Sequence, residues 1–219
     1  TSIVAGGANA CVLHYVDNDK PLNDGDLLLI DAGCELDGYA SDITRSFPVN
    51  GRFSGPQRTL YEIVLAAQQA AIEATVAGAR FTDPHDAAVR VLAQGMIDCG
   101  LIAGPLDAAI ESGAYRRFYM HRTGHWLGMD VHDVGDYREP GEPAGEHGKP
   151  WRVLRPGMVL TVEPGIYVRA ADDVPAEFHD IGIRIEDDAV VTADGRCEII
   201  TGDAPKAIDE IEALMRDGS

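Results

Sequence analysis

The sequence lacks the features that mark several classes of protein. Its 219 residues include only 18 lysines and arginines against 36 acidic residues, with no basic cluster that could follow a nucleic-acid backbone. No apolar run reaches the roughly 18 residues of a membrane helix, and the opening residues lack the basic start and apolar stretch of a signal peptide. We therefore expect a cytoplasmic protein with neither nucleic acid nor membrane among its partners.

Cysteine is also scarce. The four cysteines lie far apart, without the CxxC spacing of a metal knuckle or a redox pair: Cys11, Cys34, Cys99 and Cys197. A reduced intracellular chain fits this pattern. The chain opens on Thr1 rather than Met, directly in a strand-like segment, so we expect that further sequence once preceded it.

The first 50 residues predict strands and turns. The apolar run 27–30 has the pattern of a strand, and Asp37-Gly38 is a turn signal. If this dipeptide is the loop of a hairpin, Asp31 lies opposite Thr44. Asp42 then lies diagonally across from Asp31 on the same face, about 7–8 Å away between backbones.

The rest of the chain predicts helices followed by further strands. Helical spacing of apolar residues runs from Ser54 to Gly78 and from Asp83 to Gly100. Strands resume over 158–191, and a short helix over 208–215 closes the chain. The Gly-rich and Pro-rich segment 136–150 is typical of an irregular surface loop. Short helices beside antiparallel strands indicate one domain of the α+β class.

Three acidic residues stand at the ends of apolar strand patterns: Asp31 after LLLI, Glu163 in VLTVEP and Glu186 in GIRIED. A carboxylate at such a place is drawn out of water, and an unpaired buried charge costs several kcal/mol, so each one needs a cation or strong donors nearby. A single acidic residue is usually just solvated. Together with Asp42, however, this set could reach one pair of metal ions about 3.5–4 Å apart.

Three of the seven histidines, His121, His125 and His132, fall within the segment 120–135. His121 and His125 have the i, i+4 spacing of a zinc-protease helix. Arg122 stands where that motif has its Glu, and nearby glycines disfavour a helix, so a mononuclear zinc protease is disfavoured. Each histidine alone is equally compatible with a partly buried ring satisfied by backbone or carboxylate partners.

The types of donor indicate which metal would bind. One imidazole with four oxygen donors suits Mn²⁺, or cobalt in vitro, better than the thiolate-rich or triple-His sites usual for zinc. Arg184 lies two residues before Glu186 and so on the same face of the strand, from where it could orient the ligands.

Five motifs in order along the chain carry a family resemblance: IDAG at 30–33, SDITRSFP at 41–48, HWLGMDVHD at 125–133, TVEPGIYV at 161–168 and GIRIEDD at 182–188. Together they resemble the catalytic domain of the Xaa-Pro aminopeptidase (aminopeptidase P) and prolidase family. The resemblance spans essentially the whole chain.

The resemblance implies a pita-bread fold, an α+β fold in which antiparallel sheet is wrapped by helices and the two halves are related by a pseudo-twofold. It implies that residues 1–219 form the metallopeptidase catalytic domain, incomplete at its N-terminus and without the family's separate N-terminal domain. It also implies two divalent ions, Mn²⁺ with Co²⁺ or Zn²⁺ as alternatives. The implied substrate is a peptide with proline in second position, and the complete protein would be a homo-oligomer.

Matching positions with the family assigns the residue roles. The implied metal ligands are Asp31, Asp42, His125, Glu163 and Glu186, with Asp42 and Glu186 as the bridging pair. Glu163, His121 and His132 would handle protons in catalysis. The implied substrate-binding residues are His14, His121, His132, Tyr167 and Arg184. The expected reaction is attack by a hydroxide held between the two ions on the peptide bond that precedes proline.

Four alternatives stay open. Prolidase, an Xaa-Pro dipeptidase, uses the same ligand set and differs in the room beyond the proline. Methionine aminopeptidase shares the ligand types, but the motifs at 125–133 and 182–188 point away from it. Creatinase performs metal-free chemistry on a related fold and usually lacks several of the ligands. Other pita-bread domains are non-catalytic modules that bind peptides or proteins.

Overall fold

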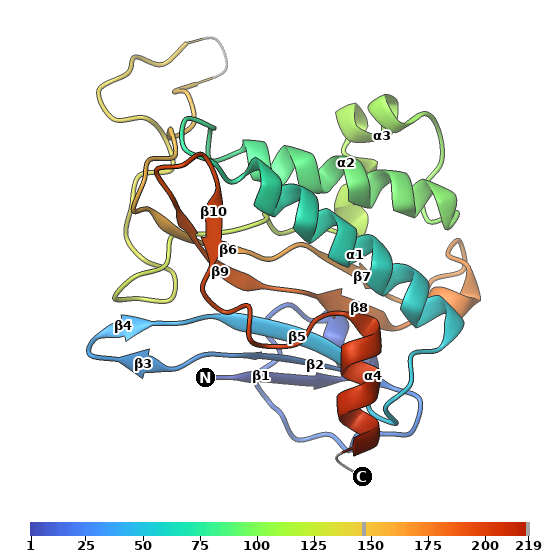
Figure 1. Ribbon diagram of the computed structural model, residues 1–219. Coiled ribbons are helices and arrows are strands. Elements are labelled where there is room, and N and C mark those ends of the chain that lie inside the picture. Colours follow the sequence, from blue (N-terminus) through green and yellow to red (C-terminus); the bar gives the residue numbers. More distant parts are fainter. Residues whose placement is uncertain (146–147, 218–219) are drawn as a thin grey trace.

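The computed structural model of the chain describes residues 1–145 and 148–217, and in it a group of strands is followed by a group of helices, a second group of strands and a final helix (Figure 1). The strands are β1 (Ile3–Gly6), β2 (Leu27–Ala32), β3 (Glu35–Leu36), β4 (Tyr39–Ala40), β5 (Ile43–Pro48), β6 (Val159–Val162), β7 (Gly165–Val168), β8 (Ile181–Arg184), β9 (Asp187–Val191) and β10 (Cys197–Ile199). The α-helices are α1 (Gly55–Ala74), α2 (Asp83–Asp98), α3 (Leu106–Ser112) and α4 (Ile208–Asp217), with short 3₁₀ turns η1 (Gly7–Cys11), η2 (Ala114–Arg117) and η3 (Ala176–Phe178). This mixture confirms the predicted α+β class.

The predicted first hairpin is present with the predicted register. Strands β2 and β5 are antiparallel, with Asp31 opposite Thr44, and the ladder continues into β3 and β4. Asp37 and Gly38 form the turn with φ of 52° and 84°, the left-handed conformation that Gly and Asp tolerate best. Strand β1 pairs with the other edge of β2, so the sheet order is β1-β2-β5.

A second antiparallel ribbon is built from the strands predicted over 158–191. Strand β6 pairs with β9, and β7 pairs with β8. Both ladders have the same register, but the pairing between them is interrupted at residues 163–164 and 185–186. Continuing that register places Glu163 opposite Glu186. Pro164 has no N–H to give to the ladder, which helps to explain the break. The described residues therefore form several small antiparallel sheets, in agreement with the antiparallel sheet that was expected.

The two long helices form where the sequence predicts them. Ser54 caps α1 through a capping box with Gln57, and Pro56 lies in the first turn. Helix α1 ends at Ala74, four residues before the predicted end at Gly78, and Thr75 leaves the helical conformation with φ of −83° and ψ of 73°. Helix α3 was not predicted, since seven residues give too little apolar periodicity to identify a helix.

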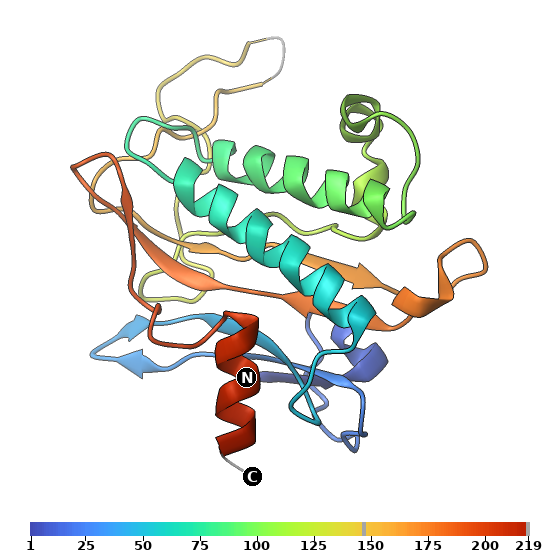
Figure 2. The ribbon, with the colours of Figure 1, turned by 45° about the vertical axis from the view of Figure 1, so that its right-hand side comes forward.

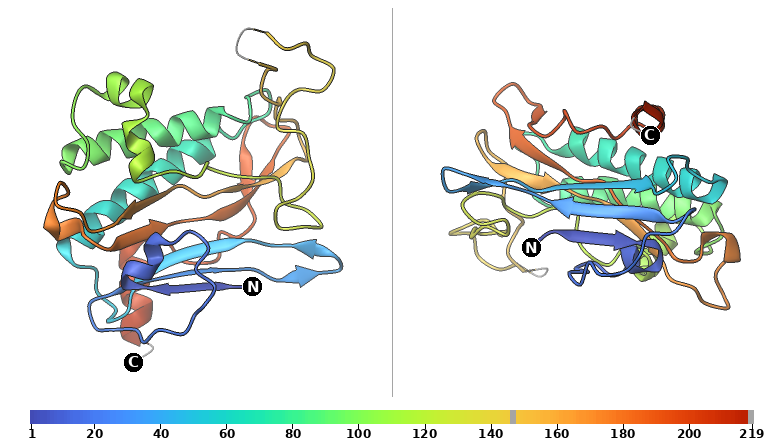
Figure 3. Two further views of the ribbon diagram at one scale, coloured as in Figure 1. Left: turned by 180° about the vertical axis from the view of Figure 1, so that it is seen from behind. Right: turned by 90° about the horizontal axis from the view of Figure 1, so that it is seen from below.

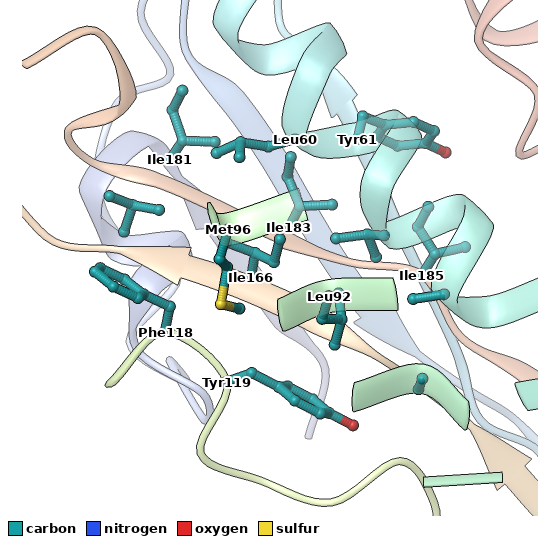
Figure 4. Close-up of a cluster of buried hydrophobic side chains, with 14 of the residues drawn as sticks. Leu60, Tyr61, Leu92, Met96, Phe118, Tyr119, Ile166, Ile181, Ile183 and Ile185 are labelled. Carbon is teal, nitrogen blue, oxygen red and sulfur yellow. The ribbon is translucent and has the colours of Figure 1, made fainter. Parts of the chain in front are cut away.

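Helices α1 and α2 lie side by side over one face of the strands (Figure 2). Figure 4 shows the core that results, with Leu60 from α1, Leu92 from α2 and Ile183 from β8 turned toward one another. All three are fully buried. Helix α4 is attached to the start of α1 by an ion pair between Arg58 and Glu212, 3.0 Å between Nη2 and Oε1.

The cap of α1 gives a prediction about stability. The Ser54 hydroxyl accepts the Gln57 N–H, whereas Thr82 at the start of α2 makes no side-chain capping bond. We expect Ser54→Ala to lower the free energy of unfolding by about 1 kcal/mol, or about 2–4 °C in Tm, and the matched control Thr82→Ala to have a smaller effect. Thermal unfolding of both variants checks this, and equal losses would contradict it.

The segment after Asp136, expected to be a surface loop, projects from the rest of the chain (Figure 3). Residues 146–147 of this loop lie outside the described residues.

All four cysteines are free, as expected of a reduced chain. Over 1–145 and 148–217, every helix is too short or too polar to cross a bilayer.

Candidate metal centre

One cavity of about 550 Å³ collects almost all of the residues singled out from the sequence. All predicted metal ligands line it, namely Asp31, Asp42, His125, Glu163 and Glu186, together with His14, His121, His132 and Arg184. Tyr167 is buried behind the wall and braces residues that do line the cavity. Side chains from positions 14 to 186 therefore share one cavity.

The four carboxylates come from the two antiparallel ribbons. Asp31 lies in β2 and Asp42 directly before β5, in the diagonal relation that the hairpin register requires. Glu163 and Glu186 occupy the interruption of the second ribbon. The backbone N–H of Glu186 donates to the Thr44 carbonyl at 3.1 Å, which joins the two ribbons at the site.

His125 reaches the carboxylates because its segment runs beside β6. The Thr161 N–H donates to the His125 carbonyl at 3.0 Å, and the Glu163 N–H donates to the Thr123 carbonyl at 2.9 Å. This close approach requires glycine at 124, since a Cβ there would lie 2.1 Å from the Thr161 carbonyl oxygen.

The ring orientation of His125 suits a metal ligand. Its Nδ1 lies 3.0 Å from the Trp126 carbonyl oxygen, which can only accept, so Nδ1 carries the hydrogen. This leaves Nε2 facing the carboxylates, 3.5 Å from Oδ2 of Asp42 and 3.6 Å from Oε1 of Glu163. A hydrogen bond from the ring nitrogen that does not bind the metal commonly holds a metal-binding imidazole in place.

Burial disfavours the charged forms of three of the four carboxylates when no cation is bound. Burial raises the pKa of Glu163 to about 7. Burial and the neighbouring carboxylates raise the pKa of Glu186 well above its ordinary value. Burial likewise raises the pKa of Asp31, although Arg184 opposes the shift. Burial also acts on Asp42, but hydrogen bonds from His125 and Asp31 lower its pKa overall.

The donor set fits divalent cations. One donor atom from each of Asp42, His125 and Glu186 lies within 4.8 Å of the other two. Bound cations would offset the burial and the repulsion that raise the pKa values of Asp31, Glu163 and Glu186. Oxygen donors with a single imidazole are the set that manganese and similar ions prefer.

Arg184 contacts one predicted ligand directly and a second one through Thr44. It is buried, and its Nη2 donates to Asp31 at 2.7 Å. Its Nε donates to the Thr44 hydroxyl at 3.1 Å, and that hydroxyl donates to Glu186 at 2.5 Å. These contacts of Thr44 were not predicted, although its spacing of two from Asp42 places both side chains on one face of the extended segment that leads into β5.

The histidines differ in how free their ring nitrogens are. In His121, Nδ1 donates to the Arg122 carbonyl, while Nε2 accepts from the Tyr167 hydroxyl, each at 2.7 Å. Burial and the charge of Arg184 lower the pKa of His121 to about 3, which keeps the ring neutral. His132 and His14 are exposed at the cavity, 6.3 Å apart between ring centroids. The His132 ring is also 4.4 Å from His125.

The fold and the donor cluster agree with the family comparisons. Residues 1–193 match the model of Metallopeptidase family M24, and the chain belongs to this family. It is 54% identical to the Xaa-Pro aminopeptidase of Haemophilus influenzae over 214 residues, which are 98% of this chain and 47% of the relative.

Solved structures give the same picture. Pseudomonas aeruginosa aminopeptidase PepP superposes with a TM-score of 0.93 at 54% identity, covering 99% of this chain and 47% of that one. A zinc-substituted Escherichia coli aminopeptidase P in complex with product has a TM-score of 0.91 at 45% identity, over 100% and 47%. These neighbours confirm the predicted pita-bread fold. The chain spans about half the length of the relatives it matches.

Proposed function

We propose that the chain is the catalytic domain, over residues 1–219, of a metal-dependent aminopeptidase that removes an N-terminal residue preceding proline. The observation that carries this proposal is the convergence of the predicted metal ligands on one cavity. Within it His125 Nε2 faces Asp42 and Glu163 at 3.5 and 3.6 Å. Its homologues are Xaa-Pro aminopeptidases, which supports a peptide substrate with proline in second position.

The residues that would hold two divalent ions are Asp31, Asp42, His125, Glu163 and Glu186, with Asp42 and Glu186 shared between the ions. We propose Mn²⁺ as the native ion, with Co²⁺ or Zn²⁺ as alternatives, because the donors are mainly oxygen. When bound, such ions supply a water of lowered pKa as nucleophile and polarise the scissile carbonyl.

The chain's own residues would then handle protons and position the substrate. Glu163 accepts the proton of the attacking water, since its carboxylate lines the cavity beside His125. His132 donates a hydrogen bond to the developing oxyanion, because its ring lies at the cavity and is exposed. His121 acts mainly by positioning, since both of its ring nitrogens are bonded. His14 binds substrate at the cavity rim.

We further propose that the complete protein is cytoplasmic, which its four free cysteines support. Its formal charge of −18 supports the absence of nucleic-acid partners. The family resemblance adds that the complete protein is a homo-oligomer. The acidic cluster would attract the protonated amine of a peptide, which favours exopeptidase over endopeptidase activity.

Peptide hydrolysis after manganese loading tests the proposal. We expect an Xaa-Pro-Xaa tripeptide to be cleaved before its proline and the matched Xaa-Ala-Xaa peptide to be cleaved at least about tenfold more slowly, a discrimination of about 1.4 kcal/mol. Liquid chromatography of the products measures both rates. Cleavage of the Xaa-Pro dipeptide alone would favour prolidase, and metal binding without cleavage of any of these peptides would favour a non-catalytic module.

A further inference from the structure

A second part of the cavity wall is aromatic and carries a cation. Phe81, Tyr137 and Trp151 line the cavity together with Arg122. Phe81 packs on Tyr137 at 4.8 Å and lies 6.5 Å from Trp151 between ring centroids. None of these residues belongs to the metal-ligand set, so the cavity has a binding surface that the metal centre does not explain.

The side chain of Arg122 is held in place at this wall. Its guanidinium carbon lies 4.4 Å from the centroid of the Trp151 ring, within cation–π distance. Trp151 is itself fixed, because the Arg80 guanidinium donates to its carbonyl at 2.9 Å. The backbones of Trp151 and Arg138 also form an antiparallel β-bridge. The Arg122 carbonyl also accepts a hydrogen bond from Nδ1 of His121, which helps to fix the backbone of Arg122 beside the predicted substrate-binding histidine.

Arg122 differs from Arg184, the other arginine among the residues that line the cavity. Arg184 is paired with Asp31 at 2.7 Å. Within 1–145 and 148–217, Arg122 has no carboxylate in salt-bridge range; Asp86 senses its charge only from farther away. In a chain with twice as many acidic as basic residues, an unpaired cation on a cavity wall is a natural site for an anionic ligand group.

Resting on the proposed function, we propose that Arg122 binds the C-terminal carboxylate of a short peptide substrate. The carboxylate cluster takes the amine end of the peptide, and Arg122 on its Trp151 support takes the acid end. The aromatic wall contacts the apolar side chain that follows the proline. The substrate class is therefore short Xaa-Pro peptides with a free C-terminal carboxylate, and chain length is limited by the reach to Arg122.

Binding of an uncleavable peptide tests the proposal without requiring turnover. The probe is an Xaa-Pro-Xaa tripeptide with a methylene in place of the scissile carbonyl, made as the free acid and as the C-terminal amide. Calorimetry on the manganese-loaded protein is expected to give at least about tenfold tighter binding of the acid, the usual effect of a charge-assisted hydrogen bond. The variant Arg122→Met, which keeps the apolar stem over Trp151, is expected to lose this preference.

Arg138→Met is the matched control. The Arg138 guanidinium also lies over Trp151, at 3.4 Å, but it donates to the Lys149 carbonyl and does not line the cavity. This variant should keep the preference for the acid. Equal binding of acid and amide by the unaltered protein, no binding of either, or equal weakening of both by Arg122→Met would overturn the proposal. Hydrolysis of the ordinary tripeptide is scored separately, so its failure would count against the proposed function alone.

Discussion

Replacing Glu186 with glutamine is expected to reduce kcat/KM for an Xaa-Pro tripeptide by more than about 1000-fold, the effect of losing several kcal/mol of metal-ion catalysis. Glutamine keeps the shape of the side chain and can still accept the Thr44 hydroxyl bond. It loses the negative charge that Glu186 would contribute to two bound cations. Metal analysis should show fewer than two ions retained for each chain, and activity should not recover at moderate excess of manganese.

The same variant separates a functional role from a structural one. Without metal, Glu186 is buried among carboxylates that raise its pKa, so removing its charge should leave the Tm of the metal-free protein unchanged or higher. Asp136→Asn, an exposed charge change outside the cavity lining, is the control for activity. Full activity of Glu186→Gln with both metals retained would refute the ligand assignment.

Replacing Asp187 with alanine is expected to cost about 3–5 kcal/mol of folding free energy, the usual result of breaking a buried ion pair. The Asp187 side chain is fully buried and accepts from Arg45 at 2.7 Å and Lys206 at 2.6 Å. Gln68 and Thr201 donate to it as well. These bonds keep the pKa of the carboxyl low despite the raising effect of burial.

The loss would arise because alanine leaves Arg45, whose side chain is only 11% exposed, without its carboxylate partner. We expect Tm to fall by roughly 10 °C in a chain of this size, measured on the metal-free protein by calorimetry. Asp173→Ala is the control, since its pair with Arg117 is exposed and should contribute little. Similar Tm changes in the two variants would contradict the importance of burial.

The first hairpin could be predicted in detail because its information is local. A turn at Asp37-Gly38 and a two-residue side-chain period are enough to set Asp31 opposite Thr44 and Asp42 on the diagonal. The helix starts at Ser54 and Asp83 were predictable for the same reason, since caps and prolines act within one turn.

The rest of the site depends on contacts that the sequence does not encode locally. Glu163 stands opposite Glu186 only through the register of a ribbon whose strands are joined by a long connection, so neither residue's neighbours identify the other. The bonds of Thr44 to Arg184 and Glu186 join segments about 140 residues apart. The resemblance to a family supplied the assignment of His125, which spacing alone could not distinguish from His121. The pseudo-twofold relation between the halves stays a prediction.

Anomalous diffraction from manganese-soaked crystals tests the central claim most directly, because it locates the ions without relying on turnover. The expected result is two peaks about 3.5–4 Å apart, enclosed by the side chains of Asp31, Asp42, His125, Glu163 and Glu186. Peaks elsewhere on the acidic surface, with none between these side chains at saturating manganese, would contradict it.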